Sequence, residues 1–357
     1  MKDILINGHE TYAGHVFFRP SLDDLPGLLG KEGPVFIIYD RNAGAHAGKI
    51  ASLMPAVSEM AIDVSEDSKT LSSVACICDW LLGCGADRNA VLLAVGGGIL
   101  TDMAGFAAAI YKRGIKAAYV PTTLLAQVDA SVGGKTGVNF YGYKNMLGVI
   151  RQPVFTYICP EVLTTLPYSH ILEGVSEMIK TFIIEDNGNY RKAVGLFSGI
   201  WSAPDRENAL ISCSDSVVGL VYESVKVKSG IVSMDPFEQG ERKKLNLGHT
   251  FAHAIEWCDH SISHGRAVSA GLVCAARLSE KAGLCRPGLS ARLAEDLAAC
   301  GLDTDLPFPA DMLRPAMVKD KKAENGKISF VLIRDIGNVE IVPLSADTVI
   351  ETLNACC

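Results

Sequence analysis

The first half of the chain alternates short apolar runs, typical of buried strands, with stretches of helical character. The apolar runs lie at 35–40, 58–64, 90–98, 115–123 and 154–160, and the helical stretches lie at 70–85 and 102–114. Continuous apolar strands indicate a sheet covered on both faces, and strands separated by helices indicate parallel pairing. This half therefore predicts an α/β domain built on a parallel sheet.

The pattern changes after Pro167. Helical periodicity continues to about Gly301, and two strand-like runs, ISFVLIRDIGNVEIVPL, follow near the end. A chain of 357 residues also exceeds the usual size of a single hydrophobic core. We expect an α/β domain over residues 1–166 and a mainly α-helical domain over residues 167–357.

Charge and hydropathy exclude several classes of protein. The net charge of -7 and the pI near 5.7 leave no basic footprint for nucleic acid or an anionic membrane. No apolar run is long enough to span a bilayer, and the start, MKDILINGHE, is neither a signal nor a transit segment. The eleven cysteines contain no CxxC pair, which favours reduced thiols. We expect a cytoplasmic protein without nucleic-acid or membrane partners.

Residues 129–137, DASVGGKTG, end like a nucleoside-triphosphate loop. The full pattern needs a glycine where this chain has Asp129, and a carboxylate there would repel a triphosphate. This position argues against a nucleotide triphosphatase. Lys135 in its glycine-framed turn still suits a smaller phosphate.

The segment AVGGGILTD lies where a buried strand would pass into a helix, which is where α/β sheets bind phosphates. Its spacing departs from GxGxxG at Thr101, and a triple glycine alone is equally compatible with a simple turn. Polar residues also follow the neighbouring strand ends: Asp40, Asn42, Glu66, Lys69, Thr122 and Thr123. Each alone is compatible with a solvated cap. Their convergence on one sheet edge favours a dinucleotide site.

Histidines are concentrated in NLGHTFAHAIE and HGRAV. His249 and His253 are spaced to share one helix face, but Thr250 stands where a zinc protease has glutamate. One histidine of this helix, with His264 and a carboxylate, would form a zinc site with an open position. The alternative is a histidine with a core or capping role.

Glu177 is the best carboxylate for such a site, because Lys180 lies one turn away on the same face; the alternative is a surface ion pair. Arg242, Asn246 and His249 share one side if their helix begins early enough, and an arginine beside an amide matches a substrate carboxylate. Further basic residues of the same stretch include Lys226, Lys228, Lys321 and Lys322. A run of charge is otherwise typical of a solvated face.

Several long blocks of the chain resemble the 3-dehydroquinate synthase family, within the sugar phosphate cyclase superfamily. They are GGGILTDMAGFAAAIYKRGI, VPTTLLAQVDASVGGKTGVN, YKNMLG, EMIK, NLGHTFAHAIE and HGRAV, and the resemblance runs nearly from end to end. It implies a Rossmann-like NAD-binding α/β domain followed by a mainly α-helical metal-binding domain.

The resemblance also implies roles for individual residues. NAD would be contacted by Asp40, Asn42, Glu66, Lys69, Gly97, Gly98, Asp102, Thr122, Thr123 and Lys144. Zinc or cobalt would be ligated by Glu177, His249 and His264. The substrate pocket would be lined by Asp129, Lys135, Asn145, Lys180, Lys228, Arg242, Asn246, His253 and Lys321, the last chosen over Lys322. Arg113 would reach the phosphate site of a neighbouring subunit, which implies a homodimer.

The activity implied is that of a phosphate-eliminating cyclase in the shikimate pathway of aromatic amino acid biosynthesis. The substrate would be a sugar acid phosphate, 3-deoxy-D-arabino-heptulosonate 7-phosphate, and the products 3-dehydroquinate and phosphate. Transient oxidation by NAD would precede phosphate elimination, reduction, ring opening and aldol closure. The alternatives are another sugar phosphate cyclase, a metal-dependent polyol or glycerol dehydrogenase, and a sensing or structural protein with an inactive site.

Three positions depart from the usual wording of the family. Tyr143 replaces a glycine before Lys144, Ala252 replaces a glycine, and Pro236 replaces an acid. None of these changes removes a proposed functional group. Tyr143 is expected to affect the shape of the loop that carries Lys144.

Overall fold

The computed structural model describes residues 1–6, 13–54, 57–319, 323–324 and 327–354. Contacts divide the chain into two compact units. The first contains residues 1–167 and 228–237, and the second contains residues 168–227 and 238–357. The expected fold class, an α/β part followed by a mainly helical part, is confirmed.

The first unit is built on a sheet of seven described strands in the order β1-β2-β9-β6-β5-β3-β4. The strands are β1 (Ile4–Ile6), β2 (Gly14–Phe18), β3 (Val35–Asp40), β4 (Ser58–Ile62), β5 (Val91–Gly96), β6 (Lys116–Pro121) and β9 (Phe155–Ile158). β1 pairs with β2 in the antiparallel sense, and the other neighbouring strands are parallel. The five strands predicted from the sequence are β3, β4, β5, β6 and β9.

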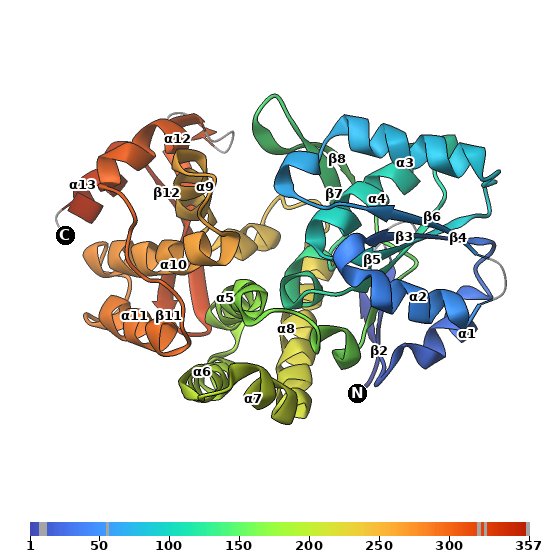
Figure 1. Cartoon of the computed structure of the whole chain (residues 1–357). Helices are drawn as coiled ribbons and strands as arrows, with labels where there is room; N and C mark the ends of the chain where they lie inside the picture. The colour runs from blue at the N-terminus through green and yellow to red at the C-terminus, as the bar shows by residue number, and fades with distance from the viewer. Residues whose placement is uncertain (7–12, 55–56, 320–322, 325–326, 355–357) are drawn as a thin grey trace. The chain divides into compact units, whose positions relative to one another are not determined.

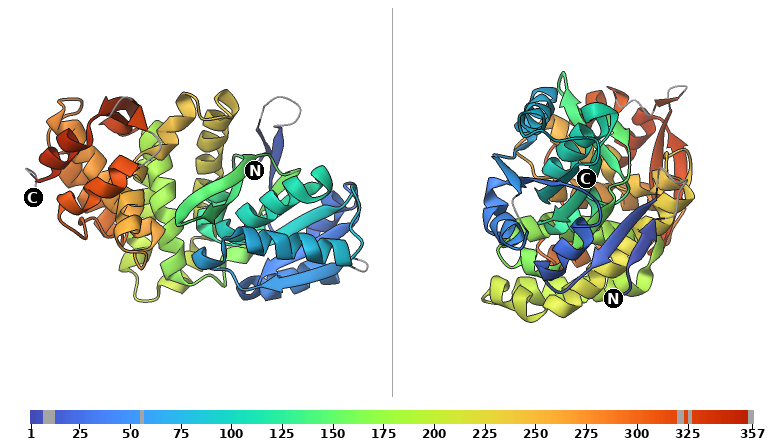
Figure 2. Two further views of the ribbon diagram at one scale, coloured as in Figure 1. Left: turned by 90° about the horizontal axis from the view of Figure 1, so that it is seen from above. Right: turned by 90° about the vertical axis from the view of Figure 1, so that its right-hand side faces the viewer.

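Helices cover both faces of this sheet (Figure 1). Leu92 of β5 packs in a core with α3 (Leu71–Gly83) and α4 (Gly98–Ile110), whereas Leu93 packs in a second core with α1 (Leu25–Leu29) and α2 (Gly44–Ser52). Figure 2 shows the same layering from two further directions. Burial on both faces explains why the strands read as continuous apolar runs. Helix α4 begins at the glycine turn itself, four residues earlier than its predicted start at 102.

A separate hairpin, absent from our predictions, joins β7 (Lys135–Phe140) to β8 (Tyr143–Ile150) and packs against α4. Tyr141 and Gly142 form its turn, with φ of 48° and 78°. Positive φ at both central residues is what a two-residue turn with the twist of the strands requires. Shorter helical turns complete the unit: η1 (Leu22–Asp24), η2 (Arg41–Ala43), η3 (Glu66–Ser68), η4 (Tyr111–Arg113), η5 (Ala126–Ala130) and η6 (Pro160–Leu163).

The second unit is mainly helical. Its longer helices are α5 (Tyr168–Glu185), α6 (Asn187–Ser202), α7 (Arg206–Ser212), α8 (Ser214–Met234, whose end belongs to the first unit), α9 (His249–Cys258), α10 (His264–Lys281), α11 (Leu289–Ala299), α12 (Arg314–Lys319) and α13 (Ala346–Asn354). Short turns η7 (Glu241–Asn246) and η8 (Ala310–Leu313) join them, with a sheet of β10 (Ala323–Glu324), β11 (Lys327–Asp335) and β12 (Asn338–Leu344). The strand pair β11–β12 confirms the predicted hairpin. No helix in the described parts of the chain is both long and apolar enough to cross a bilayer.

Helices α9 and α10 approach closely at a pair of glycines. A Cβ atom on Gly271 would lie 2.3 Å from the carbonyl oxygen of Gly248, and Gly248 itself has a φ of 76°. η7 ends at Asn246, and Gly248, whose left-handed conformation favours glycine, is the N-cap of α9. The helix of His249 thus begins too late to carry Arg242 and Asn246, so the condition under which the three residues would share one helix side is not met.

Candidate active site

Three helices of the second unit bring together a glutamate and two histidines. Glu177 lies within α5, and His249 and His264 are the first residues of α9 and α10. Glu177 Oε1 lies 3.4 Å from His249 Nε2 and 3.2 Å from His264 Nε2. The three potential ligand atoms all lie within 4.8 Å of one another. Two imidazole nitrogens and one carboxylate oxygen at this spacing fit a zinc or cobalt ion.

Electrostatics set the charge states of Glu177 and His249. Glu177 is fully buried, and its Oε2 is ion-paired with Lys180. Burial opposes ionisation, but the positive charge of Lys180, together with the neighbouring His249 and the hydrogen bond with His264, holds the pKa of Glu177 well below its usual range. Burial, reinforced by Lys180, lowers the pKa of His249 well below its usual range. Glu177 is therefore an anion and His249 a neutral ligand.

The far nitrogen of each histidine also has a partner. His249 Nδ1 lies 3.2 Å from the carbonyl oxygen of Leu247, and His264 Nδ1 lies 3.2 Å from Glu256 Oε1. Burial opposes protonation of His264, but hydrogen bonds with Glu177 and Glu256 raise its pKa to about 10. We did not predict Glu256 from the sequence, where only its place in the NLGHTFAHAIE block could have suggested it.

The other polar residues predicted in this half take different positions. Arg242 is buried in η7, with 2% of its surface exposed, and η7 packs against α5. Asn246 donates from Nδ2 to Glu238 Oε1 at 2.5 Å. His253 is exposed, with its ring 5.5 Å from that of His249. Lys321 and its alternative Lys322 lie outside the described residues.

In the first unit, the strands β4, β3, β5 and β6 are consecutive in the sheet and parallel, so their carboxyl ends meet at one edge. The loops that leave this edge carry Asp40, Asn42, Glu66, Lys69, Gly97, Gly98, Thr122 and Thr123. The structure thus gathers the loops that the sequence analysis assigned to one edge. Asp40 accepts a hydrogen bond from the backbone N–H of Asn42 at 2.9 Å, which caps η2.

A polar network centred on Lys69 lies beside these loops. The buried Lys69 donates to Asp102 Oδ2 and Asn145 Oδ1, each at 2.5 Å. Burial raises the pKa of Asp102 to about 6, although Lys69 opposes this shift. Asn139, which the sequence analysis missed, accepts from the backbone N–H of Asn145 at 2.9 Å and donates to Glu66 Oε1 at 2.8 Å. It therefore ties the β7–β8 hairpin, which also carries the exposed Lys144, to η3.

Close packing surrounds the two glycines at the start of α4. A Cβ atom on Gly98 would lie 2.7 Å from Cβ of Ala130, and one on Gly97 would lie 3.2 Å from Cγ2 of Thr123. The first turn of a helix has backbone N–H groups without intrahelical partners. The start of α4 therefore offers backbone N–H groups of the kind that bind phosphate in dinucleotide sites.

The near match to a triphosphate loop has a different structure. Lys135 follows Gly133 and Gly134, which have φ of 109° and 71°, and it begins a strand where a triphosphate loop would begin a helix. Asp129 accepts a hydrogen bond from Lys228 Nζ at 2.6 Å, and the same ammonium donates to the Asp129 carbonyl oxygen at 2.7 Å. The carboxylate that argued against a triphosphatase is thus paired with a lysine far away in the sequence.

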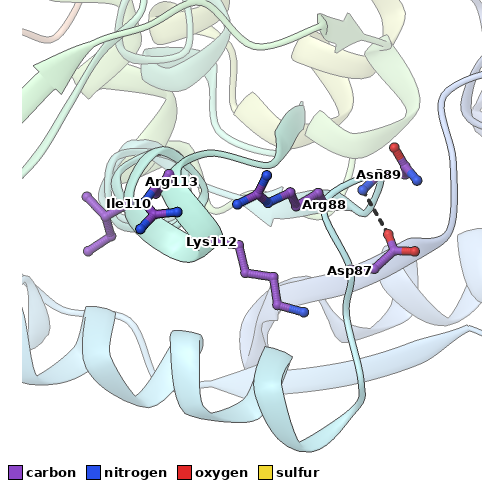
Figure 3. Close-up of a pocket in the computed structure, with 6 residues that line it drawn as sticks. All are labelled: Asp87, Arg88, Asn89, Ile110, Lys112 and Arg113. Carbon is purple, nitrogen blue, oxygen red and sulfur yellow. Dashed lines mark hydrogen bonds between the residues drawn. The ribbon is translucent and has the colours of Figure 1, made fainter.

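Arg113 is not brought to this edge of the sheet. It ends η4, just before β6 begins, and so lies at the amino-terminal edge. It lines an open depression of about 810 Å³ with Asp87, Arg88, Asn89, Ile110 and Lys112 (Figure 3). In this view the side chain of Arg88 extends toward Arg113, whereas Lys112 donates to the Ala86 carbonyl oxygen at 2.6 Å.

The α/β unit with polar loops at its carboxyl edge and the helical unit with a Glu–His–His cluster around the buried Glu177 have the fold of the sugar phosphate cyclases. The N-terminal and C-terminal families of 3-dehydroquinate synthase match residues 59–173 and 174–323. The chain therefore belongs to the 3-dehydroquinate synthase family, whose members are phosphate-eliminating enzymes. The family expected from the sequence is confirmed.

Individual relatives agree with this assignment. The chain is 39% identical over 342 residues to the 3-dehydroquinate synthase of Caulobacter vibrioides, with 90% of each protein covered. The solved 2-epi-5-epi-valiolone synthase of Streptomyces hygroscopicus, with NAD+ and Zn2+ bound, has a TM-score of 0.84 at 26% identity over 95% of both chains. A 2-deoxy-scyllo-inosose synthase complexed with carbaglucose-6-phosphate, NAD+ and Co2+ has a TM-score of 0.87 over 99% of both chains, and at 22% identity it shows the fold alone.

Proposed function

We propose that the chain converts 3-deoxy-D-arabino-heptulosonate 7-phosphate to 3-dehydroquinate and phosphate, with NAD and a divalent zinc or cobalt ion as cofactors. The observation that carries this proposal is the Glu177–His249–His264 cluster in a chain of the 3-dehydroquinate synthase family. Such a reaction belongs to the shikimate pathway, as the name of the family implies.

NAD would be held at the carboxyl edge of the parallel sheet. The Asp40 carboxylate is placed to accept from a ribose hydroxyl, and the start of α4 at Gly97 and Gly98 is placed to receive the pyrophosphate. The site would be completed by polar residues of the neighbouring loops, of α4 and of the β7–β8 hairpin: Asn42, Glu66, Lys69, Asp102, Thr122, Thr123 and Lys144. Asn145, which accepts a hydrogen bond from Lys69, would line the substrate pocket.

Glu177, His249 and His264 would hold the metal ion, because they fit its donor set and its spacing. When bound, the nicotinamide would take and return one hydride and the ion would act as a Lewis acid on the substrate hydroxyls. Lys180 keeps Glu177 ionised as a ligand. A neutral His249 directs an available lone pair toward the same position.

The two anionic groups of the substrate need cationic partners. We assign the phosphate to Lys135, which is exposed at the start of β7, and the carboxylate to Arg242, whose guanidinium offers a planar pair of donors. Lys228 keeps Asp129 paired, so that this carboxylate does not repel the phosphate. Asn246, His253 and Lys321 would supply the remaining hydrogen bonds to the sugar.

We also propose a cytoplasmic homodimer. Arg113 lies at the opposite edge of the sheet from the cofactor loops, which favours a role for it in the phosphate site of a neighbouring copy. Arg88 lies beside it and would enter the same contact. The nine described cysteines are free thiols, as expected in a reducing compartment.

The deciding experiment measures phosphate release from the heptulosonate phosphate with NAD at a small fraction of the substrate concentration. We expect one phosphate per substrate, many turnovers per NAD, and no net NADH. Net accumulation of NADH would instead identify a polyol or glycerol dehydrogenase. Phosphate release only from another sugar phosphate would identify a sister cyclase, and ligand binding without phosphate release would identify an inactive site.

A further inference from the structure

Glu256 is a buried carboxylate for which the function proposed above provides no role. It lies on α9, with 4% of its surface exposed. Its Oε1 lies 3.2 Å from Nδ1 of His264, on the side of the ring away from Glu177. Burying a carboxylate is costly unless it has a partner. The partner here is the imidazole of a proposed metal ligand.

The two histidines of the cluster are held by the same arrangement. Each directs Nε2 toward Glu177 Oε1 and Nδ1 toward an acceptor, which is the Leu247 carbonyl oxygen for His249 and Glu256 for His264. An acceptor at Nδ1 keeps the proton on that nitrogen and leaves the lone pair of Nε2 available for a metal. The difference is that Glu256 is charged and the carbonyl is not.

Charge explains why a carboxylate is suited to this position. Glu177 is the single anionic ligand of the cluster, and its charge is offset by the ion pair with Lys180. A divalent cation would therefore meet two histidines and a neutralised acid unless another anion lay nearby. Glu256 supplies that negative charge through its contact with Nδ1 of His264.

We propose that Glu256 is a positioning residue of the metal site, which fixes the orientation of the His264 ring and strengthens its Nε2 as a ligand. The inference rests on the metal role proposed for Glu177, His249 and His264. Both partners sit at fixed places on packed helices, because α9 and α10 meet at Gly248 and Gly271. Small losses of alignment would therefore register in metal affinity.

A purely structural role is the alternative. His264 is the first residue of α10, and a carboxylate near the start of a helix stabilises it through the helix dipole. Glu173 already fills that role, because its Oε2 accepts from the backbone N–H of Gly265 at 2.5 Å. Glu173 therefore provides a matched control: a carboxylate at the same helix start with a bond to the backbone.

The test measures Co2+ binding by the full chain after its metal is removed with a chelator. Wild type and the variants Glu256→Ala, Glu256→Gln and Glu173→Gln are titrated with Co2+ against a chelating dye, and the visible spectrum of the bound ion is recorded. We expect Glu256→Ala to weaken Co2+ binding about 10- to 100-fold and to shift the spectrum. Glu256→Gln should lose less affinity, because its amide oxygen still accepts from Nδ1. Glu173→Gln should lower the thermal midpoint while it keeps wild-type affinity and spectrum.

Wild-type affinity and spectrum in Glu256→Ala would overturn the positioning role. Equal losses of affinity in Glu173→Gln and Glu256→Gln would also overturn it, since both would then act only through the helix start. Glu256→Gln differs from wild type by a single group of equal size, so it keeps the test available if the alanine variant fails to fold. A wild-type protein that binds no Co2+ would instead overturn the metal site itself, and the inference with it.

Discussion

The two units each bury a lysine with a carboxylate, yet the two carboxylates behave differently. Burial raises the pKa of Asp102 to about 6 although Lys69 lies against it. Glu177 is more deeply buried beside Lys180, and its pKa stays well below the usual range because two histidines also face it. The comparison teaches that one ammonium does not offset burial of a carboxylate, whereas an ammonium with two imidazoles does.

The largest effect should come from removing Glu177, which both His249 and His264 face. Glu177→Ala should abolish stoichiometric metal binding, measured by elemental analysis, and lower kcat/KM about 1,000-fold, because Lewis-acid stabilisation contributes on the order of 4 kcal/mol. Full activity in a variant without bound metal would contradict the metal site. Wild type treated with a chelator should lose activity similarly and regain it with Zn2+.

The next largest effect should come from removing the ammonium group of Lys180, which pairs with Glu177. Lys180→Met should lower the unfolding free energy of the metal-free protein by about 3 kcal/mol, because it leaves a buried carboxylate without its cation. Denaturant unfolding measures this, and added Zn2+ should recover part of the loss. The matched control is Lys226→Met, which removes the surface pair with Glu223 at the same spacing and should cost less than about 1 kcal/mol. Equal losses of unfolding free energy in the two variants would show that the buried pair contributes no more than the surface pair.

The pair of Asp102 and Lys69 can be tested through the pH dependence of stability. Because the pKa of Asp102 is about 6 in the folded protein against 3.8 in a model peptide, the folded state binds more protons between these values. The contribution of Asp102 to the unfolding free energy therefore falls as pH rises from about 4 to 6, by up to about 3 kcal/mol. Asp102→Asn should lack this decline. Parallel stability curves for wild type and variant would show that Asp102 titrates normally.

A smaller effect is expected from the phosphate contact. Lys135→Ala should lower kcat/KM about 10- to 100-fold, since a charge-assisted contact contributes roughly 1.5–3 kcal/mol. The control is Lys49→Ala, which removes a lysine paired with Glu161 in the same unit. Turnover assays should show wild-type rates for the control and not for Lys135→Ala.

The smallest effect should come from the departure at Tyr143. Its side chain is half exposed on β8, where Tyr143 pairs with Phe140 beside the turn and the register shifts between Phe140 and Val138. Tyr143→Gly should therefore change the affinity for NAD less than threefold and lower stability by roughly 0.5–1 kcal/mol, the usual cost of a glycine within a strand. Calorimetric titration with NAD measures the first quantity. A tenfold change would mean that Tyr143 shapes the loop around Lys144.

Contacts within one element could be predicted from the sequence. Glu177 and Lys180 pair because helix periodicity places residues three apart on one face, and the β3 loop lies with its neighbours because parallel strands share a carboxyl edge. A site that combines His264 with one histidine of α9 was proposed from the residue types, but the choice of His249 over His253 followed only from the family resemblance, since nothing in their spacing fixes the crossing of two helices.

Contacts between distant elements could not be predicted. Lys228 reaches Asp129 across 99 residues, and Glu256 reaches His264 from a different helix. The β7–β8 hairpin was missed because its residues were read as a binding motif, although Tyr141–Gly142 is a turn signal between two β-rich runs. Asn139 was missed for the same reason, since its partners become visible only when the hairpin forms.

The close crossing of α9 and α10 makes one distant position decisive. A methyl group at residue 271 would collide with the backbone at Gly248, and α10 would have to move away from α9. His264 would then part from His249 while every ligand remained in the sequence. Genetic screens for inactive alleles should therefore recover changes at Gly271. The metal ligands would all be present in such alleles, so the ligands alone would not explain the loss of activity.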